Sequence, residues 1–575
     1  MSDIPPVYAL RNYALLADGE RGALIDPEGN VAWMCAPRWH DPAIFSSLIG
    51  GRSFYTVTPN CRFVWGGHYE TGGLIWRSRW ITNGGIVECR EALAMPATAD
   101  RVVLLRRIEV QDGECTLVVR LEPRAQFDQQ PLIDHHLDDQ GVWHGRAGTM
   151  PVHWVGGAQA SVQPDGCLDF ELAMNEGDRH DLVLTIGGAP VEGTADELWE
   201  RTEAEWSERV PSMDHTLAPR DATQAVAVMR GLTAASGGMV AAATMSLPER
   251  SHAGTSYDYR YAWIRDTCYA GQAGAAANVL PLLDDSLRFV RERLLEHGPD
   301  LKPAYTAQGG KVPEQSHVGL PGYPGGTDVM GNQVTNQFQL DAFGEIMQVI
   351  AAAARHGRDQ ADDWRAAEVA ADVVAGHWHE KDAGVWELDQ KEWTHSRLCL
   401  VGGLKAIADA APDGVGDPEG WRALAEQILR DCSERCLHES GRWKRAVDDD
   451  RVDASLLLGA LRGAIPPDDP RSRATMAAVL EELCEEHFIY RFRHDDGPLG
   501  QAEGAFLLCG FWASLACRQQ GAEADALRFF ERARAGCGSP GLLAEEFDVQ
   551  QRQLRGNLPQ AFVHAQLLEC AATLA

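Results

Sequence analysis

The stretch TADELWERTEAEWSERV, residues 194–210, marks the point at which the periodicity of this chain changes. Its first four residues have the Thr-x-x-Glu spacing of a capping box, which starts a helix. Leu198, Trp199 and Trp206 then fall on one helical face. We therefore expect a linker helix here that packs on one or both of its neighbouring units.

Upstream of this stretch the sequence has the character of β-strands. Residues 101–122, RVVLLRRIEVQDGECTLVVRLE, contain two runs rich in β-branched residues on either side of Asp112-Gly113, and this dipeptide predicts a hairpin turn. Similar short runs, bounded by glycine and proline, recur at 53–57, 73–81 and 180–186. We predict a large antiparallel β-sandwich.

Downstream of residue 220 the apolar residues recur with the period of helices. Twelve helices are expected to begin near Ala222, Asp266, Pro281, Val334, Ala361, Arg397, Pro418, Asp453, Arg471, Ala502, Ala522 and Leu558. Long aromatic loops between them indicate a functional role, because such loops are uncommon in a compact domain. Six helical hairpins closed into an (α/α)6 barrel fit this pattern. An open solenoid would need a repeated unit, and we see none.

The predicted organisation is a β-domain over 1–194, a linker region over 195–220 and a helical catalytic domain over 221–575. With 52 basic and 83 acidic residues the formal net charge is −31. Such a surface repels nucleic acid and anionic lipid, so the expected partner is a neutral small molecule. Neither an apolar run of membrane-spanning length nor a secretory signal is visible. Scattered cysteines without a Cys-x-x-Cys pair favour reduced, buried thiols in the cytoplasm.

Three loop segments carry candidate chemistry. In residues 257–266, YDYRYAWIRD, aromatic rings alternate with charged residues. Rings stack on the apolar faces of sugars, while Arg and Asp bind vicinal hydroxyls. A packed aromatic core and a simple ion pair of Arg265 with Asp266 at a helix start are the structural alternatives.

The second and third segments supply carboxylates. In GVWEL, residues 384–388, a carboxyl set against an indole is partly desolvated, which raises its pKa and suits a general acid. Residues 541–548, GLLAEEFD, hold three acids close to a helix that Pro559 begins. Exposed, solvated loop carboxylates are the alternative in both cases. The order and spacing of the three segments are more informative than any one of them.

In that order the chain resembles the family 15 glycoside hydrolases, which include glucoamylases, glucodextranases and bacterial and archaeal trehalases. The similarity runs along nearly the whole chain. It includes Trp33-Met-Cys35, Gln339-Leu-Asp341, Asp453-Ala-Ser-Leu-Leu and Gly556-Asn-Leu-Pro-Gln-Ala-Phe562. The family fold is a β-super-sandwich joined by a linker to an (α/α)6 barrel, so the resemblance implies this architecture.

The resemblance also implies the site. Glu387 matches the family's general acid, and Glu545 matches its general base. Arg265 and Asp266 match the residues that bind hydroxyls of the terminal glucose. The other substrate-binding residues implied are Tyr259, Trp263, Trp386 and Arg491. No metal and no cofactor is expected, and the acidic loop Asp448-Asp449-Asp450 lacks EF-hand spacing.

The implied reaction is exo-acting, inverting hydrolysis of a terminal α-linked glucose, of the glucoamylase type. Leu388 stands where glucoamylases often have a second Glu, the stretch 387–395 is short, and Pro324–Asp328 lacks an expected Arg. These departures lie around the leaving group and leave the aglycone open. An α,α-trehalase with the same carboxylates is the nearest alternative. A catalytically silent carbohydrate-binding protein and an inverting phosphorylase are the others, although Glu545 would repel phosphate.

Overall fold

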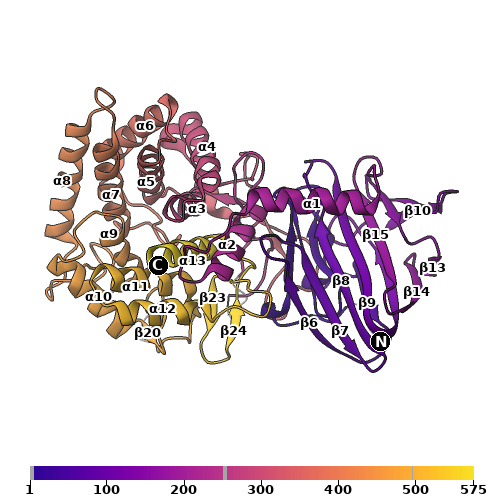
Figure 1. Ribbon diagram of the computed structural model, residues 1–575. Coiled ribbons are helices and arrows are strands. Elements are labelled where there is room, and N and C mark those ends of the chain that lie inside the picture. Colours follow the sequence, from indigo (N-terminus) through magenta and orange to yellow (C-terminus); the bar gives the residue numbers. More distant parts are fainter. Residues whose placement is uncertain (1–4, 250–255, 495–496) are drawn as a thin grey trace.

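The computed structural model describes residues 5–249, 256–494 and 497–575. Figure 1 shows a β-sheet unit and a helical unit side by side, with helix α1 (Ala195–Arg209) lying along the β-sheet unit and leading toward the helical unit. No helix in the described part of the chain is long and apolar enough to cross a membrane. The antiparallel β-unit, linker helix and helical barrel predicted from the sequence are confirmed.

The β-unit consists of two antiparallel sheets that share one core. The smaller sheet has the order β1 (Ala14–Ala17), β2 (Gly22–Ile25), β3 (Val31–Cys35) and β4 (Ala43–Phe45). The main path of the larger sheet is β10 (Leu132–Leu137), β11 (Trp143–Ala147), β12 (Met150–Val155), β15 (Arg179–Ile186), β9 (Val102–Glu122), β8 (Gly85–Leu93), β7 (Trp76–Thr82) and β6 (Phe63–Tyr69). Also paired in it are β5 (Phe54–Pro59), β14 (Leu168–Asn175) and β13 (Ser161–Val162). Met34 of the smaller sheet and Trp76 of the larger sheet both belong to this core.

Strand β9 corrects one prediction. Asp112-Gly113 is not a hairpin turn, because β9 continues through it for 21 residues. Gly113 has a φ of 69°, and the register of β8 against β9 shifts between Ile86 and Val87. The extra residue is Gln111, so β9 has a β-bulge just before Gly113, close to the point at which the strand exchanges its partners. Before the bulge it pairs with β8 and β15, and after it with β5 and β14.

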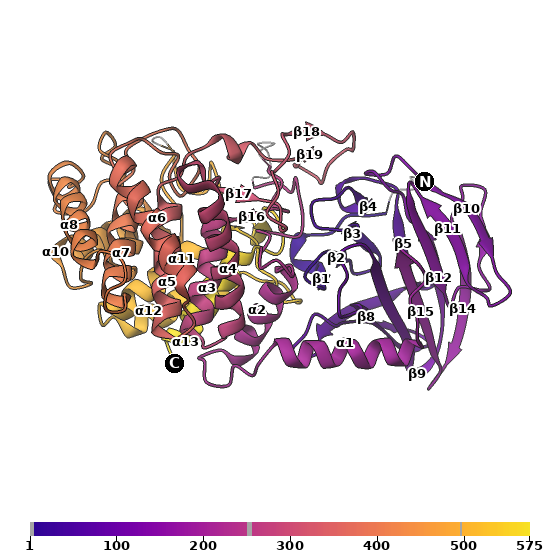
Figure 2. The same cartoon turned by 90° about the horizontal axis from the view of Figure 1, so that it is seen from above.

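Helix α1 begins with the predicted capping box. The Thr194 hydroxyl accepts a hydrogen bond from Glu197 N–H, and the Glu197 carboxylate accepts one from Thr194 N–H. Trp199 and Trp206 are buried, and the guanidinium of Arg90 lies 4.2 Å from the centre of the Trp199 ring. The helix thus lies along the β-unit and leads into the helical unit (Figure 2).

The helical unit contains the twelve predicted helices in its described part. They are α2 (Pro219–Leu232), α3 (Ile264–Ala276), α4 (Leu280–His297), α5 (Asp341–Arg355), α6 (Ala361–His377), α7 (Thr394–Ala410), α8 (Pro418–Arg435), α9 (Leu458–Leu461), α10 (Pro470–Glu482), α11 (Leu507–Gln519), α12 (Glu523–Arg534) and α13 (Ala561–Thr573). The odd-numbered helices from α3 to α13 pack in succession, and α13 returns to α3. This ring is the inner layer of an (α/α)6 barrel, with the other helices outside it.

Four predicted helix starts lie several residues too early. One is Asp453, because a 3-10 turn over 454–457 precedes α9. Residues 333–336 form a 3-10 turn capped by Asn332, so α5 begins only at Asp341. Ala505–Phe506 pair with β23 (Glu546–Asp548) before α11 begins. Helix α13 begins at Ala561, after Gln560. In each case the residues before the inner helix form a structured segment that is not part of the α-helix.

These loops contain short strands, which are β16 (Ala262–Trp263), β17 (Ala304–Tyr305), β18 (Ser316–His317), β19 (Val329–Met330), β20 (Cys484–Glu485), β21 (Phe488–Ile489), β22 (Ala505–Phe506), β23 (Glu546–Asp548) and β24 (Gln553–Arg555). β16 leads directly into α3, and β22 leads directly into α11. The pairing of such strands fixes the loops at the N-terminal ends of the inner helices. This end of the barrel carries the candidate site.

Candidate active site

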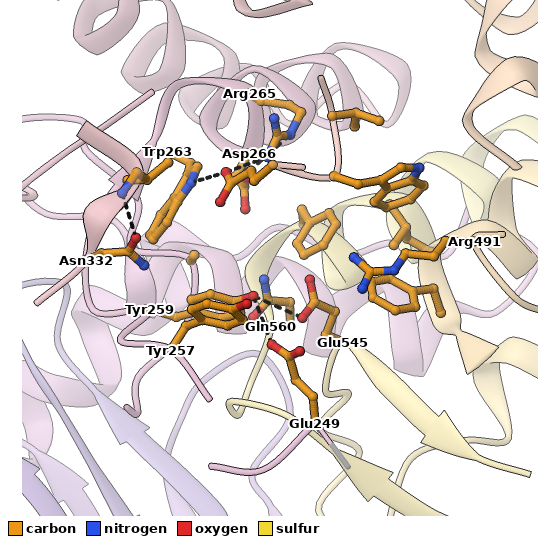
Figure 3. A pocket seen from close by; sticks show the side chains of 18 of the residues that line it. Glu249, Tyr257, Tyr259, Trp263, Arg265, Asp266, Asn332, Arg491, Glu545 and Gln560 are labelled. Carbon is orange, nitrogen blue, oxygen red and sulfur yellow. Dashed lines mark hydrogen bonds and ion pairs between the residues drawn. The ribbon is translucent and has the colours of Figure 1, made fainter. Parts of the chain in front are cut away.

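A pocket of about 330 Å³ opens at the N-terminal ends of the inner helices (Figure 3). All eight residues that the sequence analysis selected line it, although they come from four separate segments of the chain. They are Tyr259, Trp263, Arg265, Asp266, Trp386, Glu387, Arg491 and Glu545. Its size and its mixture of aromatic and charged groups suit a small polar ligand.

Three donors converge on one oxygen of Glu387. Oε1 accepts hydrogen bonds from the Trp263 indole N–H at 2.7 Å, from Arg265 at 3.2 Å and from Gln339 at 3.2 Å. A proton on this carboxyl is therefore carried by the other oxygen, Oε2. The Glu387 backbone has a φ of 57°, a left-handed conformation that is costly for a residue with a side chain.

The loop that holds Glu387 is organised by Asp382. Its Oδ2 accepts hydrogen bonds from the N–H groups of Leu340 and Gly384 and from the hydroxyl of Ser396. Burial, together with the charge of Asp341, raises the pKa of Asp382 to about 7. The sequence analysis missed this residue, which lies five positions before Glu387 and outside the pocket.

Arg265 and Asp266 form part of a network rather than a simple ion pair at a helix start. The Arg265 guanidinium donates to Gln339 at 2.9 Å and to Asp341 at 3.3 Å, while its nearest approach to Asp266 is 3.9 Å. Burial raises the pKa of Asp266 to about 6 in spite of the charge of Arg265. Both side chains line the pocket, where they are available to hydroxyl groups.

Glu545 is the more buried of the two candidate catalytic carboxyls. It is 8% exposed and accepts a hydrogen bond of 3.2 Å from the Tyr259 hydroxyl. Glu249, which the sequence analysis did not select, lies 3.4 Å from the same hydroxyl oxygen. Burial and then the charge of Glu249 raise the pKa of Glu545 well above its usual range. The desolvated carboxyl expected in the second segment is thus found in the third.

Trp386 does not face the carboxyl of Glu387 in the expected way. Its indole N–H donates to both oxygens of Asp453, at 2.8 and 2.9 Å. Arg491 lies with its guanidinium 4.5 Å from the centre of the Phe506 ring and pairs with Glu503 at 2.6 Å. Both side chains line the pocket, but each is already held by a carboxylate.

A group of amides and neighbouring side chains completes the lining. Those not selected from the sequence include Glu249, Tyr257, Gln315, Asn332, Gln333, Gln337 and Gln560. Among them Gln560 belongs to a motif that carries the family resemblance, whereas Glu249, in Leu-Pro-Glu-Arg, has no local signal. Long-range folding alone brings Glu249 to Glu545.

The acidic loop at 448–450 is occupied by ion pairs. Asp449 pairs with Arg451 at 2.7 Å, Asp448 with Lys391 at 3.5 Å, and Asp450 with Lys444 at 3.3 Å. In the part of the chain that the structure describes, no group of three or more His, Cys, Asp or Glu side chains is arranged to hold a metal ion.

The family to which this scaffold belongs follows from its match to a family model. The model for "Glycosyl hydrolases family 15" matches residues 224–572, which include most of the helical unit and its pocket. The chain belongs to glycosyl hydrolase family 15. A second model, "Trehalase-like, N-terminal", matches residues 7–210, so the β-unit of this family 15 hydrolase also has relatives of its own.

Several curated relatives that match nearly the full length of this hydrolase are trehalases. The trehalase of Mycolicibacterium smegmatis is 29% identical over 98% of this chain and 91% of its own length. Trehalase 1 of Sulfolobus acidocaldarius is 28% identical over 97% of this chain and 98% of its own. An isomaltose glucohydrolase of Kribbella flavida is 27% identical but covers only 53% of this chain.

Among solved structures, a bacterial glucoamylase complexed with acarbose has the same fold. It superposes with a TM-score of 0.71 over 98% of this chain and 93% of that protein, at 13% identity. The β-unit, the linker and the barrel of this family 15 hydrolase are therefore a known combination. The chain is a glycoside hydrolase that acts on a carbohydrate substrate.

Proposed function

We propose that Glu387 and Glu545 are the catalytic acid and base of an inverting reaction on a terminal α-glucoside. The observation that carries this proposal is that the two carboxyls matching the family's acid and base line the same pocket. Three N–H donors occupy one oxygen of Glu387, while Glu545 is buried beneath Tyr259. Inverting hydrolysis requires two such groups with separate environments, one on either face of the sugar.

Glu387 acts first as the proton donor. With Oε1 held by Trp263, Arg265 and Gln339, the proton on Oε2 passes to the glycosidic oxygen as its bond to the anomeric carbon breaks. Arg265 then stabilises the carboxylate that forms, because it already lies 3.2 Å from Oε1. The preformed contacts keep this carboxyl in one orientation throughout the step.

Glu545 acts as the base on the opposite face. It takes a proton from a water molecule, whose oxygen forms the new bond to the anomeric carbon. The hydroxyl of Tyr259, 3.2 Å from Glu545, orients the carboxylate. The product sugar leaves as the β-anomer, and both protons are accounted for by the two carboxyls.

The remaining pocket residues bind the terminal glucose. Arg265 and Asp266 offer charged donors and acceptors for vicinal hydroxyls, and the rings of Tyr259 and Trp263 offer apolar surface. The two rings meet edge to face with their centroids 5.5 Å apart, so they form a corner into which a sugar ring fits.

We propose α,α-trehalose as the substrate. Trehalases from bacteria and archaea match almost the whole chain, including the β-unit, and this changes the order of preference that the sequence alone gave. The neutral amides of Gln315, Asn332, Gln333 and Gln337 suit the hydroxyls of a second glucose, while Leu388 offers the leaving sugar no polar group. Maltose-type glucans are the second candidate, because the proposed contacts to the terminal glucose serve either substrate.

A substrate panel tests this choice. Purified protein is assayed for kcat/KM with trehalose, maltose, isomaltose and maltotetraose, each with and without phosphate. We expect trehalose to be hydrolysed fastest. Phosphate should not be consumed as a reactant, so the rate should not depend on it in that role. Preference for maltotetraose would establish the glucoamylase-type activity instead. Sugar phosphate as the product would identify a phosphorylase, and binding without turnover would identify a silent carbohydrate-binding protein.

A further inference from the structure

A third carboxylate lies against the proposed base. Glu249 is 8% exposed and lies 3.4 Å from the Tyr259 hydroxyl oxygen, which is itself 3.2 Å from Glu545 (Figure 3). The position of Glu249 is fixed by its neighbours, since Pro248 accepts a hydrogen bond from Gly556 N–H and Ser246 N–H donates to Tyr257. Two acidic side chains therefore share one hydroxyl group inside the pocket.

The hydroxyl of Tyr259 has a single proton to donate. Where it donates to Glu545 it stabilises the ionised carboxylate, and where it donates to Glu249 that stabilisation is lost. Two buried carboxyls on one hydroxyl also repel each other when both are ionised. Both effects act in the same direction on Glu545, making it hold its proton more tightly.

We propose that Glu249 is a positioning residue that sets the basicity of Glu545 by competing for the Tyr259 hydroxyl. This inference rests on the proposed role of Glu545. A base that binds its proton more tightly removes a proton from water more readily, provided that the pH is high enough to ionise it. Glu249 thereby strengthens the base and raises the pH below which the enzyme loses activity.

Other charged and titratable groups around Glu545 do not replace Glu249 in this role. Arg491 lowers the pKa of Glu545, but its guanidinium is shared with Glu503 at 2.6 Å. Glu546 is turned to the backbone, since its Oε2 accepts from Gly504 N–H at 2.7 Å. The groups that face Glu545 or interact with its charge in the described residues are Glu249, Tyr257, Tyr259, Asp266, Arg491, Cys509 and Glu546.

The test is a direct titration that does not depend on turnover. Protein labelled with carbon-13 at the glutamate carboxyls is titrated by NMR, and the Glu545 signal is assigned from its loss in Glu545→Gln. We expect the midpoint for Glu545 to fall by about one pH unit in Glu249→Gln, because a like charge and a competitor are removed. In the Tyr259→Phe background the same substitution should shift the midpoint less, because no hydroxyl is left to compete for.

Glu314→Gln provides the matched control, since Glu314 is an exposed carboxylate outside the pocket. Its Glu545 midpoint should equal that of the wild-type protein. An unchanged midpoint in Glu249→Gln, or an equal shift with and without the Tyr259 hydroxyl, would overturn the inference.

Kinetics separate this inference from the proposed function. If Glu545 is the base, the acid limb of kcat/KM moves to lower pH in Glu249→Gln by the same amount as the NMR midpoint. A moved midpoint without a moved limb would leave the effect on Glu545 standing but refute Glu545 as the base. The third outcome is a uniform loss of rate at every pH, with the NMR midpoint of Glu545 and the acid limb of kcat/KM both unchanged. It would assign Glu249 a merely structural role, which refutes this inference but not the proposed function.

Discussion

The indole N–H of Trp263 donates a hydrogen bond of 2.7 Å to Oε1 of Glu387. Trp263 is the last residue of β16 and Glu387 lies in the loop before α7, so two separate loops of the barrel meet at this contact. The tryptophan thereby fixes which oxygen of the acid is free to carry the proton. It joins a residue of the sugar pocket directly to the proposed acid.

Removal of this donor should slow the reaction without unfolding the protein. In Trp263→Phe an aromatic surface remains but Oε1 loses its shortest hydrogen bond. A hydrogen bond to a charged group contributes about 1.5–3 kcal/mol, so we expect kcat to fall roughly 10- to 100-fold. Trp378→Phe, at a half-buried tryptophan outside the pocket, is the control and should retain full kcat. Equal loss in both variants would contradict a specific role for the contact.

We expect Asp266 to lower the stability of the folded protein while it contributes to substrate binding. Its pKa is raised from the ordinary value of 3.8 to about 6, so the folded protein binds this proton more tightly than the unfolded chain. At pH 7 the ionised, buried group costs at most about 3 kcal/mol, and the cost disappears below pH 4, where both states are protonated. Asp266→Asn should therefore raise Tm at pH 7 and lose activity.

The pH dependence distinguishes this effect from a general gain in packing. The difference in Tm between Asp266→Asn and the wild type, measured by calorimetry, should shrink between pH 6 and pH 4. A gain in Tm that is the same at every pH, or a lower Tm at pH 7, would contradict the electrostatic explanation.

The amide side chains that line the pocket should contact only the leaving sugar. Gln333 lines the pocket from the turn before α5. In Gln333→Ala we expect KM for trehalose to rise by roughly fivefold, since a hydrogen bond to a neutral group contributes about 1 kcal/mol. With α-glucosyl fluoride, whose leaving group is not a sugar, kcat/KM should be unchanged. A similar loss on both substrates would place Gln333 at the terminal glucose instead.

The bulge in β9 provides a stability prediction remote from the pocket. A Cβ added to Gly113 would lie 2.1 Å from the carbonyl oxygen of Gly84, and its φ of 69° disfavours other residues. Gly113→Ala should destabilise the protein by about 1–3 kcal/mol, measured by urea unfolding. Activity at 25 °C should be retained, because the barrel loops are untouched. Normal stability in this variant would contradict a requirement for glycine at position 113.

The features predicted well from the sequence are those with a local cause. The capping box at Thr194 and Glu197 and the apolar periodicity of the inner helices depend on residues within a few turns of one another. Asp112-Gly113 misled because a glycine with positive φ serves a hairpin and a bulge equally, and the choice depends on the distant strands β5 and β14. The division into 1–194, 195–220 and 221–575 stays a prediction.

The candidate site also combines features that local sequence predicts with features that depend on distant residues. Family motifs predicted the eight residues that meet in the pocket, but their motifs did not reveal the contacts between them. Tyr259 and Glu545 lie 286 residues apart, so their hydrogen bond follows from closure of the barrel. Glu249 has no motif at all. Trp386 donates to Asp453, and the indole in contact with Glu387 is that of Trp263. Neither follows from local spacing.

The central claim is a single displacement by Glu387 and Glu545. Proton NMR of the sugar released in the first minutes, before the anomers equilibrate, tests it most directly. From trehalose we predict one α- and one β-glucose per turnover, because only one half is displaced, and neither product in Glu387→Gln or Glu545→Gln. From maltotetraose, if it is cleaved, the released glucose should be β. Early α-glucose alone from either substrate, or full activity in either variant, would contradict the mechanism.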